Sequence, residues 1–279
     1  MKLETIENII LRSSSRGMEQ LCPLLPPEFC AKAASSLLGL RRGNVLIATG
    51  FYVEGFAETD GPPGAYFLAK ALDALGFHCT VITDKYGRGF FDFPDSGSVA
   101  AEYVGIDVDE FELSRILDQY KPVAIISIER CGINANGDYA NMRGTSIADH
   151  TARLDYLFEE GTRRSIPTFG IGDGGNEIGM GCFKVAIEQE LSLTPCVTKV
   201  DYPIIAAVSN WGAYGLCAYL QKFSGLPVMP ASSEVAEYIS HIVKMGSIDG
   251  VTGEHAPTVD GFPGETERET VELLLIQAQ

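Results

Sequence analysis

The sequence predicts an α/β fold: a Rossmann-like, doubly wound, mostly parallel sheet with helices on both faces and helical additions at both chain ends. Short apolar runs rich in β-branched residues alternate with amphipathic helical patterns, as expected for parallel strands that helices bury on both faces. The strand, loop and helix order recurs along the chain. The 279 residues are 46% hydrophobic and 21% charged, so the chain can bury a full core.

Each predicted strand is a short apolar run bounded by a turn signal. The first clear strand, 44–51, precedes a helix that begins at Pro62-Pro63 and stops at Gly76. Pro122 ends a later helix directly before another strand. We place strands at 44–51, 78–84, 123–129, 167–173 and 203–209. Between the second strand and the helix near 111 we expect a glycine- and phenylalanine-rich loop and an acidic segment.

Helices are predicted wherever apolar residues recur with helical spacing. The first forty residues predict two helices packed on the sheet, and the others are placed at 62–76, 111–120, 151–161, 183–191, 211–223, 233–245 and 269–279. We expect a single domain over 1–279, made of an N-terminal helical extension (1–42), a sheet core (43–230), and C-terminal helices with a capping loop (231–279).

The charge balance restricts the partners of the chain. A formal net charge of -16 repels phosphate backbones and anionic membrane surfaces, so we expect neither nucleic acid nor a membrane as a partner. A small anionic substrate would need a local group of Arg or Lys side chains. The seven cysteines form no C-x-x-C pair, which indicates reduced, mostly buried thiols. Without a secretory signal or a bilayer-length apolar run, we expect a cytoplasmic protein, and the sequence leaves a homodimer open.

Ligands of open parallel sheets bind beyond the carboxyl ends of the strands, where loops diverge and helix N-termini present free N–H groups. Four loops there are rich in glycine or polar residues: 50–64, 84–95, 129–149 and 170–181. The first contains Glu58 and Asp60, which we take as candidate substrate-binding residues. We therefore expect the functional site at this edge of the sheet.

The loop 170–181, GIGDGGNEIGMG, has six glycines. Three of them, Gly172, Gly174 and Gly175, would let the backbone approach a ligand closely. The polar side chains Asp173, Asn176 and Glu177 are the candidate catalytic groups of this loop. A tight turn between a strand and a helix is the alternative, although it needs fewer glycines.

The same loop matches the letters of a dinucleotide fingerprint, with Gly170, Gly172 and Gly175 after a strand, so NAD binding is a competing hypothesis. Carboxylates would then stand where a pyrophosphate must approach bare backbone, and they repel phosphate. The letters alone therefore favour NAD binding only weakly.

The loop 129–149 begins with Glu129 and mixes acids, amides and two arginines. Either Arg130 or Arg143 could bind a carboxylate bidentately, and Asn136 and Asp138 are further candidate substrate-binding residues. Alternatively, the loop is solvated and its charges pair among themselves.

The four histidines lack the spacing of common zinc sites. The loop 247–264 holds Asp249, Glu254 and Asp260 among glycines and prolines, a composition that suits a pocket cap or an oxygen-ligated cation. No cofactor is certain from the sequence. Mg²⁺ or Mn²⁺ is the candidate ion, with Asp173, Glu177 and Asp249 as candidate ligands.

Four segments carry a resemblance to a known family: GFYVEGFAETDGPPGA at 50–65, ERCGINANGDYANMRG at 129–144, GIGDGGNEIGMG at 170–181, and SIDGVTG with TVDG near 247–261. Over nearly its whole length the chain resembles the D-glutamate cyclase C-terminal domain family, in a free-standing form. The mitochondrial member of that family joins this domain to a second, N-terminal domain. The resemblance implies a hydro-lyase that closes D-glutamate, or a related small acid, to 5-oxoproline with loss of water.

Such a cyclisation needs an uncharged amine, an electrophilic carboxyl group and a stabilised oxyanion. We hypothesise that Arg130 or Arg143 holds the α-carboxylate, and that Asp173 or Glu177 acts first as base and then as acid. Glycine-loop N–H groups would face the oxyanion, and Glu129 beside Asp173 would raise one pKa. The competing hypotheses are an NAD- or ATP-dependent enzyme and a non-catalytic amino-acid-binding module.

Overall fold

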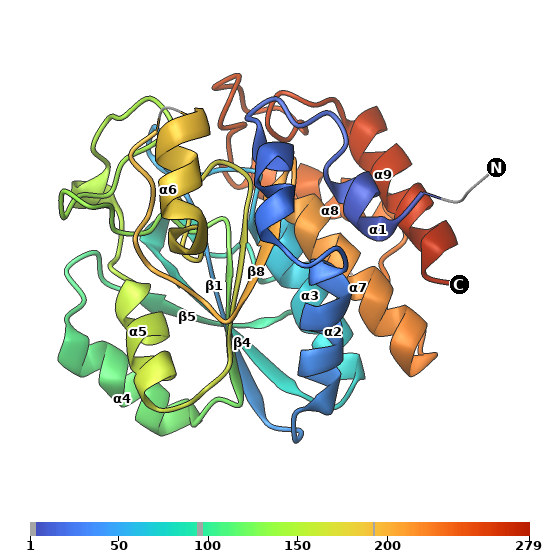
Figure 1. Cartoon of the computed structure of the whole chain (residues 1–279), viewed down its shortest axis with the longest axis horizontal. Helices are drawn as coiled ribbons and strands as arrows, with labels where there is room; N and C mark the ends of the chain where they lie inside the picture. The colour runs from blue at the N-terminus through green and yellow to red at the C-terminus, as the bar shows by residue number, and fades with distance from the viewer. Residues whose placement is uncertain (1–3, 94–96, 192) are drawn as a thin grey trace.

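A six-stranded parallel sheet forms the centre of the computed structural model, which describes residues 4–93, 97–191 and 193–279 (Figure 1). The strands are β1 (Asn44–Thr49), β4 (His78–Asp84), β5 (Ala100–Val104), β6 (Ala124–Ile128), β7 (Thr168–Gly172) and β8 (Tyr202–Ile205). Their order across the sheet is β5-β4-β1-β6-β7-β8. If these six strands are numbered from 1 to 6 along the chain, their order across the sheet is 3-2-1-4-5-6. This is the strand order of doubly wound proteins, and it confirms the predicted fold class.

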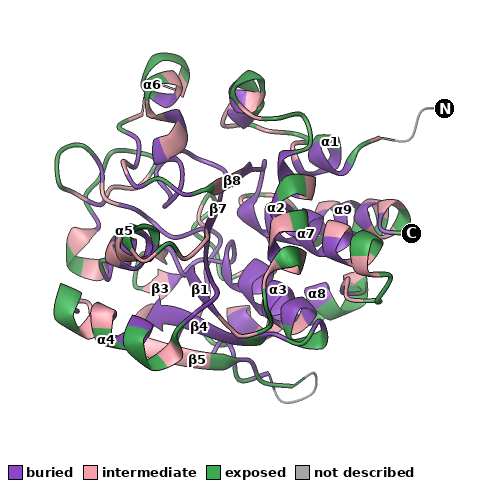
Figure 2. Ribbon diagram, turned by 60° about the horizontal axis from the view of Figure 1, so that its bottom comes forward, coloured by how far each residue is buried: buried purple, intermediate pink, exposed green. Residues whose placement is uncertain are grey.

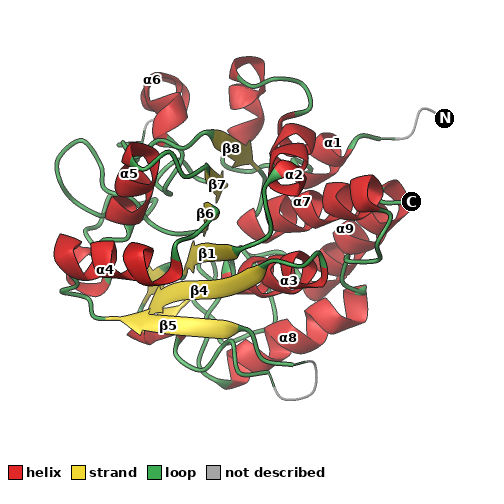
Figure 3. Ribbon diagram, turned by 90° about the horizontal axis from the view of Figure 1, so that it is seen from below, coloured by secondary structure: helices red, strands yellow, loops and turns green. Residues whose placement is uncertain are grey.

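Helices cover both faces of this sheet (Figure 3). One face carries α4 (Glu110–Tyr120) and α5 (Asp155–Arg163). The other carries α1 (Ile6–Ile10), α2 (Phe29–Gly39), α3 (Pro62–Ala74), α7 (Ser209–Ser224), α8 (Ser232–Lys244) and α9 (Gly264–Gln277). None of the helices described here is long and apolar enough to cross a membrane.

The central strand shows why both faces need a cover. Val45 and Ile47 belong to the larger core cluster beneath α2, α3 and α7, whereas Leu46 and Ala48 point to the smaller cluster beneath α4 and α5. All four side chains are buried. Successive residues of a strand face opposite sides of the sheet, so both sides must be covered for β1 to be buried as it is in Figure 2.

The structure corrects several predicted elements. Strand β5 lies where we expected a loop. The sequence of this half-exposed edge strand, AAEYV, has no apolar run, and for that reason no strand was predicted there. Strand β1 ends at Thr49, two residues earlier than predicted. A small hairpin follows it, β2 (Tyr52–Val53) with β3 (Phe56–Ala57), that the sequence did not indicate. Residues 183–191 form only α6 (Lys184–Ala186) and a π-helical turn, Ile187–Leu191. Helix α5 begins four residues later than predicted, since 151–154 are not helical.

Glu267, on α9, supplies a test of this packing. It is 4% exposed, it accepts a hydrogen bond from Trp211 Nε1, and burial raises its pKa from 4.5 to about 7. Ionisation of Glu267 therefore destabilises the folded state. The contribution of its protonated form to the unfolding free energy is complete below pH 4.5 and is lost as the pH rises through about 7. We expect Glu267→Gln to remove this loss, so that the variant gains up to about 3 kcal/mol on the wild type between acidic and alkaline pH.

Urea unfolding of both proteins across this pH range measures the difference. A difference that stays constant with pH would contradict the assignment of a raised pKa to Glu267.

Candidate active site

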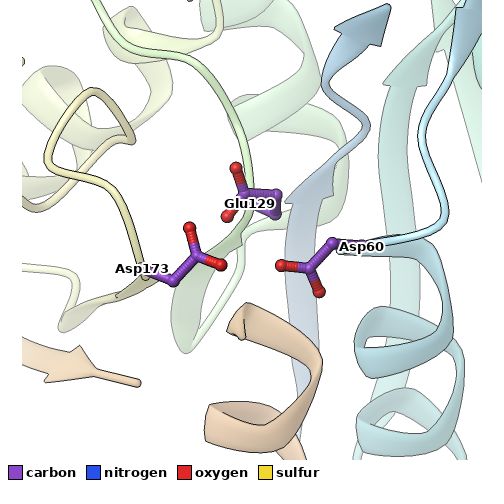
Figure 4. Close-up of side chains that lie close together, drawn as sticks. All are labelled: Asp60, Glu129 and Asp173. Carbon is purple, nitrogen blue, oxygen red and sulfur yellow. The ribbon is translucent and has the colours of Figure 1, made fainter. Parts of the chain in front are cut away.

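Three carboxylates from different segments meet at the carboxyl edge of the sheet (Figure 4). Glu129 directly follows β6, Asp173 directly follows β7, and Asp60 lies just before α3. One oxygen of each lies within 4.8 Å of the others, and all three residues are buried. The group sits beside the boundary between β1 and β6, where the strand order reverses and doubly wound proteins bind their ligands.

Helices α3 and α7 hold these acids through reciprocal caps. The backbone N–H groups of Ser209 and Asn210 each donate to Asp60 at 2.8 Å, so Asp60 caps α7. In return, the Asn210 side-chain oxygen accepts the N–H groups of Gly61 and Gly64 at the start of α3, at 3.0 and 2.8 Å. Ser209 also donates its hydroxyl to Glu129 at 2.6 Å. The two helix starts therefore fix two of the three carboxylates.

Arg16 is the cation that lies against these acids, and the sequence reasoning missed it. Its guanidinium lies 2.6 Å from Asp173 Oδ1 and binds Asp260 with both terminal nitrogens at 2.8 and 3.0 Å. Ser13 and Gly17 adopt positive φ on either side and turn the segment toward the sheet. Arg12 and Arg16 flank a run of three serines, but nothing in this local pattern indicated the distant partners of Arg16.

Six buried carboxyl groups, which we call the acid cluster, gather around Arg16: Glu58, Asp60, Glu129, Asp173, Glu177 and Asp260. Burial raises the pKa of every one of them, and repulsion between neighbouring acids adds to the effect at Glu129 and Asp260. The pKa of Asp60 and that of Asp173 each reach about 8. The cluster can therefore hold protons near neutral pH, or it can bind a cation.

The glycine loop serves the acid cluster in a way that the sequence did not indicate. Gly174 and Gly175 donate their N–H groups to the Glu177 carboxylate at 2.8 and 2.7 Å. A Cβ on Gly172 would lie 2.7 Å from a Glu177 oxygen, so that glycine makes room for the same side chain. The expectation that these N–H groups face a substrate oxyanion is thereby corrected, because Glu177 already uses them.

A cavity of about 780 Å³ opens onto the acid cluster. Its acidic wall contains Glu58, Glu129, Asp173 and Glu177, together with Asn176 and Arg16. Its lining also contains Arg143, the aromatic residues Tyr52 and His150, and the loop 250–253. His150 stacks on Tyr52 with ring centres 4.3 Å apart. The cavity thus combines anionic, cationic and aromatic surfaces. Six of the predicted site residues border it: Glu58, Glu129, Arg143, Asp173, Asn176 and Glu177.

Arg130 lies elsewhere. It is fully buried, pairs with Asp84 at 2.7 Å, and donates to the carbonyl oxygens of Gly50 and Ala152 at 2.6 and 2.7 Å. These contacts lock the chain after β1, after β6 and before α5. Of the two arginines in the predicted pair, only Arg143 borders the cavity.

Three further predicted residues do not border the cavity either. Asn136 is exposed in a turn, and the Asp138 carboxylate accepts the Ser146 hydroxyl at 2.7 Å. Burial disfavours the charge of Asp249, but hydrogen bonds from Thr258 and from the loop backbone lower its pKa. Asp249 therefore anchors the loop 247–264 and does not join the three carboxylates. Of the predicted loop 84–95, residues 94 and 95 lie outside the described part of the chain.

A second cavity, of about 700 Å³, lies between α4 and α5. Its buried acid, Asp155, already accepts hydrogen bonds from Tyr139 at 2.7 Å, from Thr198 and from the Ile133 N–H. With this carboxylate satisfied, the cavity has less chemistry to offer than the one beside the acid cluster.

Comparison with known proteins gives a match over nearly the whole chain. Residues 6–275 match the family model described as D-glutamate cyclase-like, C-terminal. Human mitochondrial D-glutamate cyclase is 30% identical over 321 residues, an alignment that covers 98% of this chain and 51% of the human protein. The chain therefore spans about half the length of this relative.

Solved structures of two Bordetella bronchiseptica enzymes, WbmG with NAD and WbmH with NAD⁺, are 12% and 14% identical to the chain, each with a TM-score of 0.32. The alignments cover 65% and 75% of this chain and 50% and 65% of those chains. We draw nothing about function from so distant a likeness.

The different positions of Arg130 and Arg143 lead to a test. Arg130→Gln leaves Asp84 buried without its partner, so we expect a loss of about 3–5 kcal/mol in unfolding free energy. Arg143→Gln, on an exposed loop, should change it by less than about 0.5 kcal/mol. Urea denaturation of both variants measures this, and equal stabilities would show that Arg130 has no structural role.

Proposed function

The chain belongs to the D-glutamate cyclase-like, C-terminal family, and on that premise we propose that it converts D-glutamate, or a related small amino dicarboxylic acid, to a 5-oxoproline-type lactam and water. The protein would then be a carbon–oxygen lyase. The observation that supports the proposal most strongly is the cavity at the strand switch point, whose lining combines members of the acid cluster with Arg16 and Arg143. This pattern of charges matches a substrate with one ammonium and two carboxylate groups.

The reaction balances without an oxidant or a second substrate. The amine nitrogen attacks the γ-carboxyl carbon, a C–N bond forms and a C–O bond breaks. The two protons that the ammonium nitrogen loses leave with the displaced oxygen as water. The protein must therefore orient the two ends of one molecule and move protons between them.

Each end of the substrate has a complementary wall. The acid cluster attracts the ammonium group, and the exposed guanidinium of Arg143 can bind the α-carboxylate in a two-pronged way. Arg16, beside Asp173, would face the γ-carboxyl group and offset the charge that develops on its oxygen. The substrate would thus lie across the cavity, with its reacting atoms against the acids.

Glu177 is our candidate for proton transfer. It borders the cavity, and the N–H groups of Gly174 and Gly175 hold its carboxylate in one orientation. Burial raises its pKa, which makes it a better base than an exposed glutamate. Glu177 would take a proton from the amine and return it to the leaving oxygen, while the amide of Asn176 orients the substrate.

The strand order also favours a second candidate, a nucleotide-dependent enzyme, since dinucleotides bind at the same switch point. In such proteins the phosphates rest on the helix that follows the first strand. Here that helix, α3, begins with two prolines that have no N–H, and Asn210 takes the N–H groups of Gly61 and Gly64. We therefore favour the cyclase over a nucleotide enzyme.

The primary test is product formation. Purified protein is given D- or L-glutamate, and 5-oxoproline is measured by chiral chromatography. We expect turnover of the D form and a fall of about a hundredfold or more in kcat for Glu177→Gln and for Asp173→Asn. Glu267→Gln, a buried acid outside the cavity, is the matched control and should keep its activity. Undiminished turnover in both site variants would refute the assignment.

Ligand-dependent melting separates the candidate functions, because a ligand that binds only the folded state raises the melting temperature. We expect D-glutamate and 5-oxo-D-proline to raise it, and NAD and ATP to leave it unchanged. A rise with NAD or ATP alone would favour the nucleotide enzyme. A rise with glutamate without any product in the first assay would favour an amino-acid-binding module.

A further inference from the structure

The geometry of Asp60, Glu129 and Asp173 has a feature that binding an ammonium group does not require. Their oxygens lie within 4.8 Å of one another, although three carboxylates in a buried site repel each other. Two oxygens bound to one ion can be at most twice the metal–oxygen distance apart, roughly 4 Å for Mg²⁺ and roughly 5 Å for Ca²⁺. One ion can thus reach all three residues with little or no movement of the chain.

A second, independent observation concerns polar atoms that lack partners. Asn176 is 4% exposed and faces the cavity beside Glu129 and Asp173, and its side-chain oxygen accepts no hydrogen bond from the described residues. Its amide nitrogen is used, since it donates to the Ala140 carbonyl at 2.9 Å. The Thr49 hydroxyl, fully buried at the end of β1, is likewise unsatisfied. Buried oxygens normally have partners, so these two atoms point to a ligand that supplies positive charge.

The carboxylate of Asp173 is directed toward the other two acids of the proposed site. Figure 4 shows its carboxylate turned toward Glu129 and Asp60. Its Oδ1 forms an ion pair with Arg16 at 2.6 Å, and its side chain shares a hydrogen bond with another acid, Asp260. One arginine shared with Asp260 does not balance three carboxylates, which leaves room for a further cation.

The surroundings of the other two carboxylates resemble those of metal ligands. Asp60 is held by the N–H groups at the start of α7, and Glu129 by the Ser209 hydroxyl. Such outer hydrogen bonds orient ligating carboxylates in metalloproteins. Glu129 and Asp173 border the cavity, so an ion between them would keep a side open to water or substrate.

We propose that Asp60, Glu129 and Asp173 bind one divalent cation of the Mg²⁺, Mn²⁺ or Ca²⁺ class. All the donors are oxygens, which suits these hard ions and disfavours zinc or copper. This ligand set replaces the one expected from the sequence, since Asp249 is engaged in its own loop and Glu177 by glycine N–H groups. The binding of the ion does not depend on the proposed cyclase reaction. The role that we give the ion, which is to polarise the carboxyl group that the amine attacks, does rest on that reaction.

Titration of the purified chain with Mn²⁺ tests the site without any substrate. Free Mn²⁺ is followed by its electron paramagnetic resonance signal at mildly alkaline pH. We expect one bound ion per chain, displaced by Mg²⁺ or Ca²⁺, and a loss of affinity of about tenfold or more in Asp60→Asn and in Asp173→Asn. The control Glu267→Gln, which also replaces a buried acid by an amide, should bind like the wild type.

A measurement on the wild type guards against variants that fail to fold. Fe²⁺ with ascorbate and peroxide cleaves the backbone near a bound ion, and the fragments are identified by mass spectrometry. We expect cleavage close to residues 60, 129 and 173, suppressed by Mn²⁺.

Three results would overturn the proposal: no Mn²⁺ binding up to about 1 mM, equal affinity in wild type and both aspartate variants, or cleavage confined to other segments. Mn²⁺ binding without 5-oxoproline formation would reject the cyclase and keep the site. Formation of 5-oxoproline without Mn²⁺ binding would reject the cation site and keep the cyclase.

Discussion

The arrangement of the site depends on the reciprocal capping of α3 and α7. Asp60, at the start of α3, accepts the first N–H groups of α7, and Asn210, at the start of α7, accepts those of α3. Each helix thereby supplies the cap of the other, which joins two segments about 150 residues apart in the chain. Ser209, at the start of α7, also donates its hydroxyl to Glu129. The start of α7 therefore fixes the position of Asp60 relative to Glu129 at the end of β6.

This capping explains how the chain can concentrate carboxylates that it cannot fully neutralise. A buried carboxyl group is costly unless it is protonated, hydrogen-bonded or paired. Asp60 and Glu177 rely on backbone N–H groups, Glu129 on a hydroxyl, and Asp173 and Asp260 on Arg16. The remaining excess of acid faces a cavity, where a cationic or proton-exchanging ligand can offset it. We regard that excess as the functional property of the site.

The sequence predicted the parts of this site that follow from periodicity and sheet topology. Glu129 and Asp173 come directly after apolar strands, and parallel strands bring their carboxyl ends to one edge. The contact of Arg16 with Asp260, 244 positions apart, has no local pattern and appears only when the chain is folded. Arg130 and Arg143 could not be told apart, because burial against Asp84 is a tertiary effect. The glycines were predicted to bring the backbone close to a ligand, whereas in the structure Gly174 donates its N–H to Glu177 and Gly172 makes room for that side chain.

We propose that the cavity beside the acid cluster binds a small lactam-forming acid. A crystal structure of the chain with 5-oxo-D-proline tests it most directly. We expect the carboxylate of the ligand at Arg143 and its lactam ring against Asp173 and Glu177. Ordered ligand in the cavity between α4 and α5 instead, with the acid cluster unchanged, would rule out this binding site.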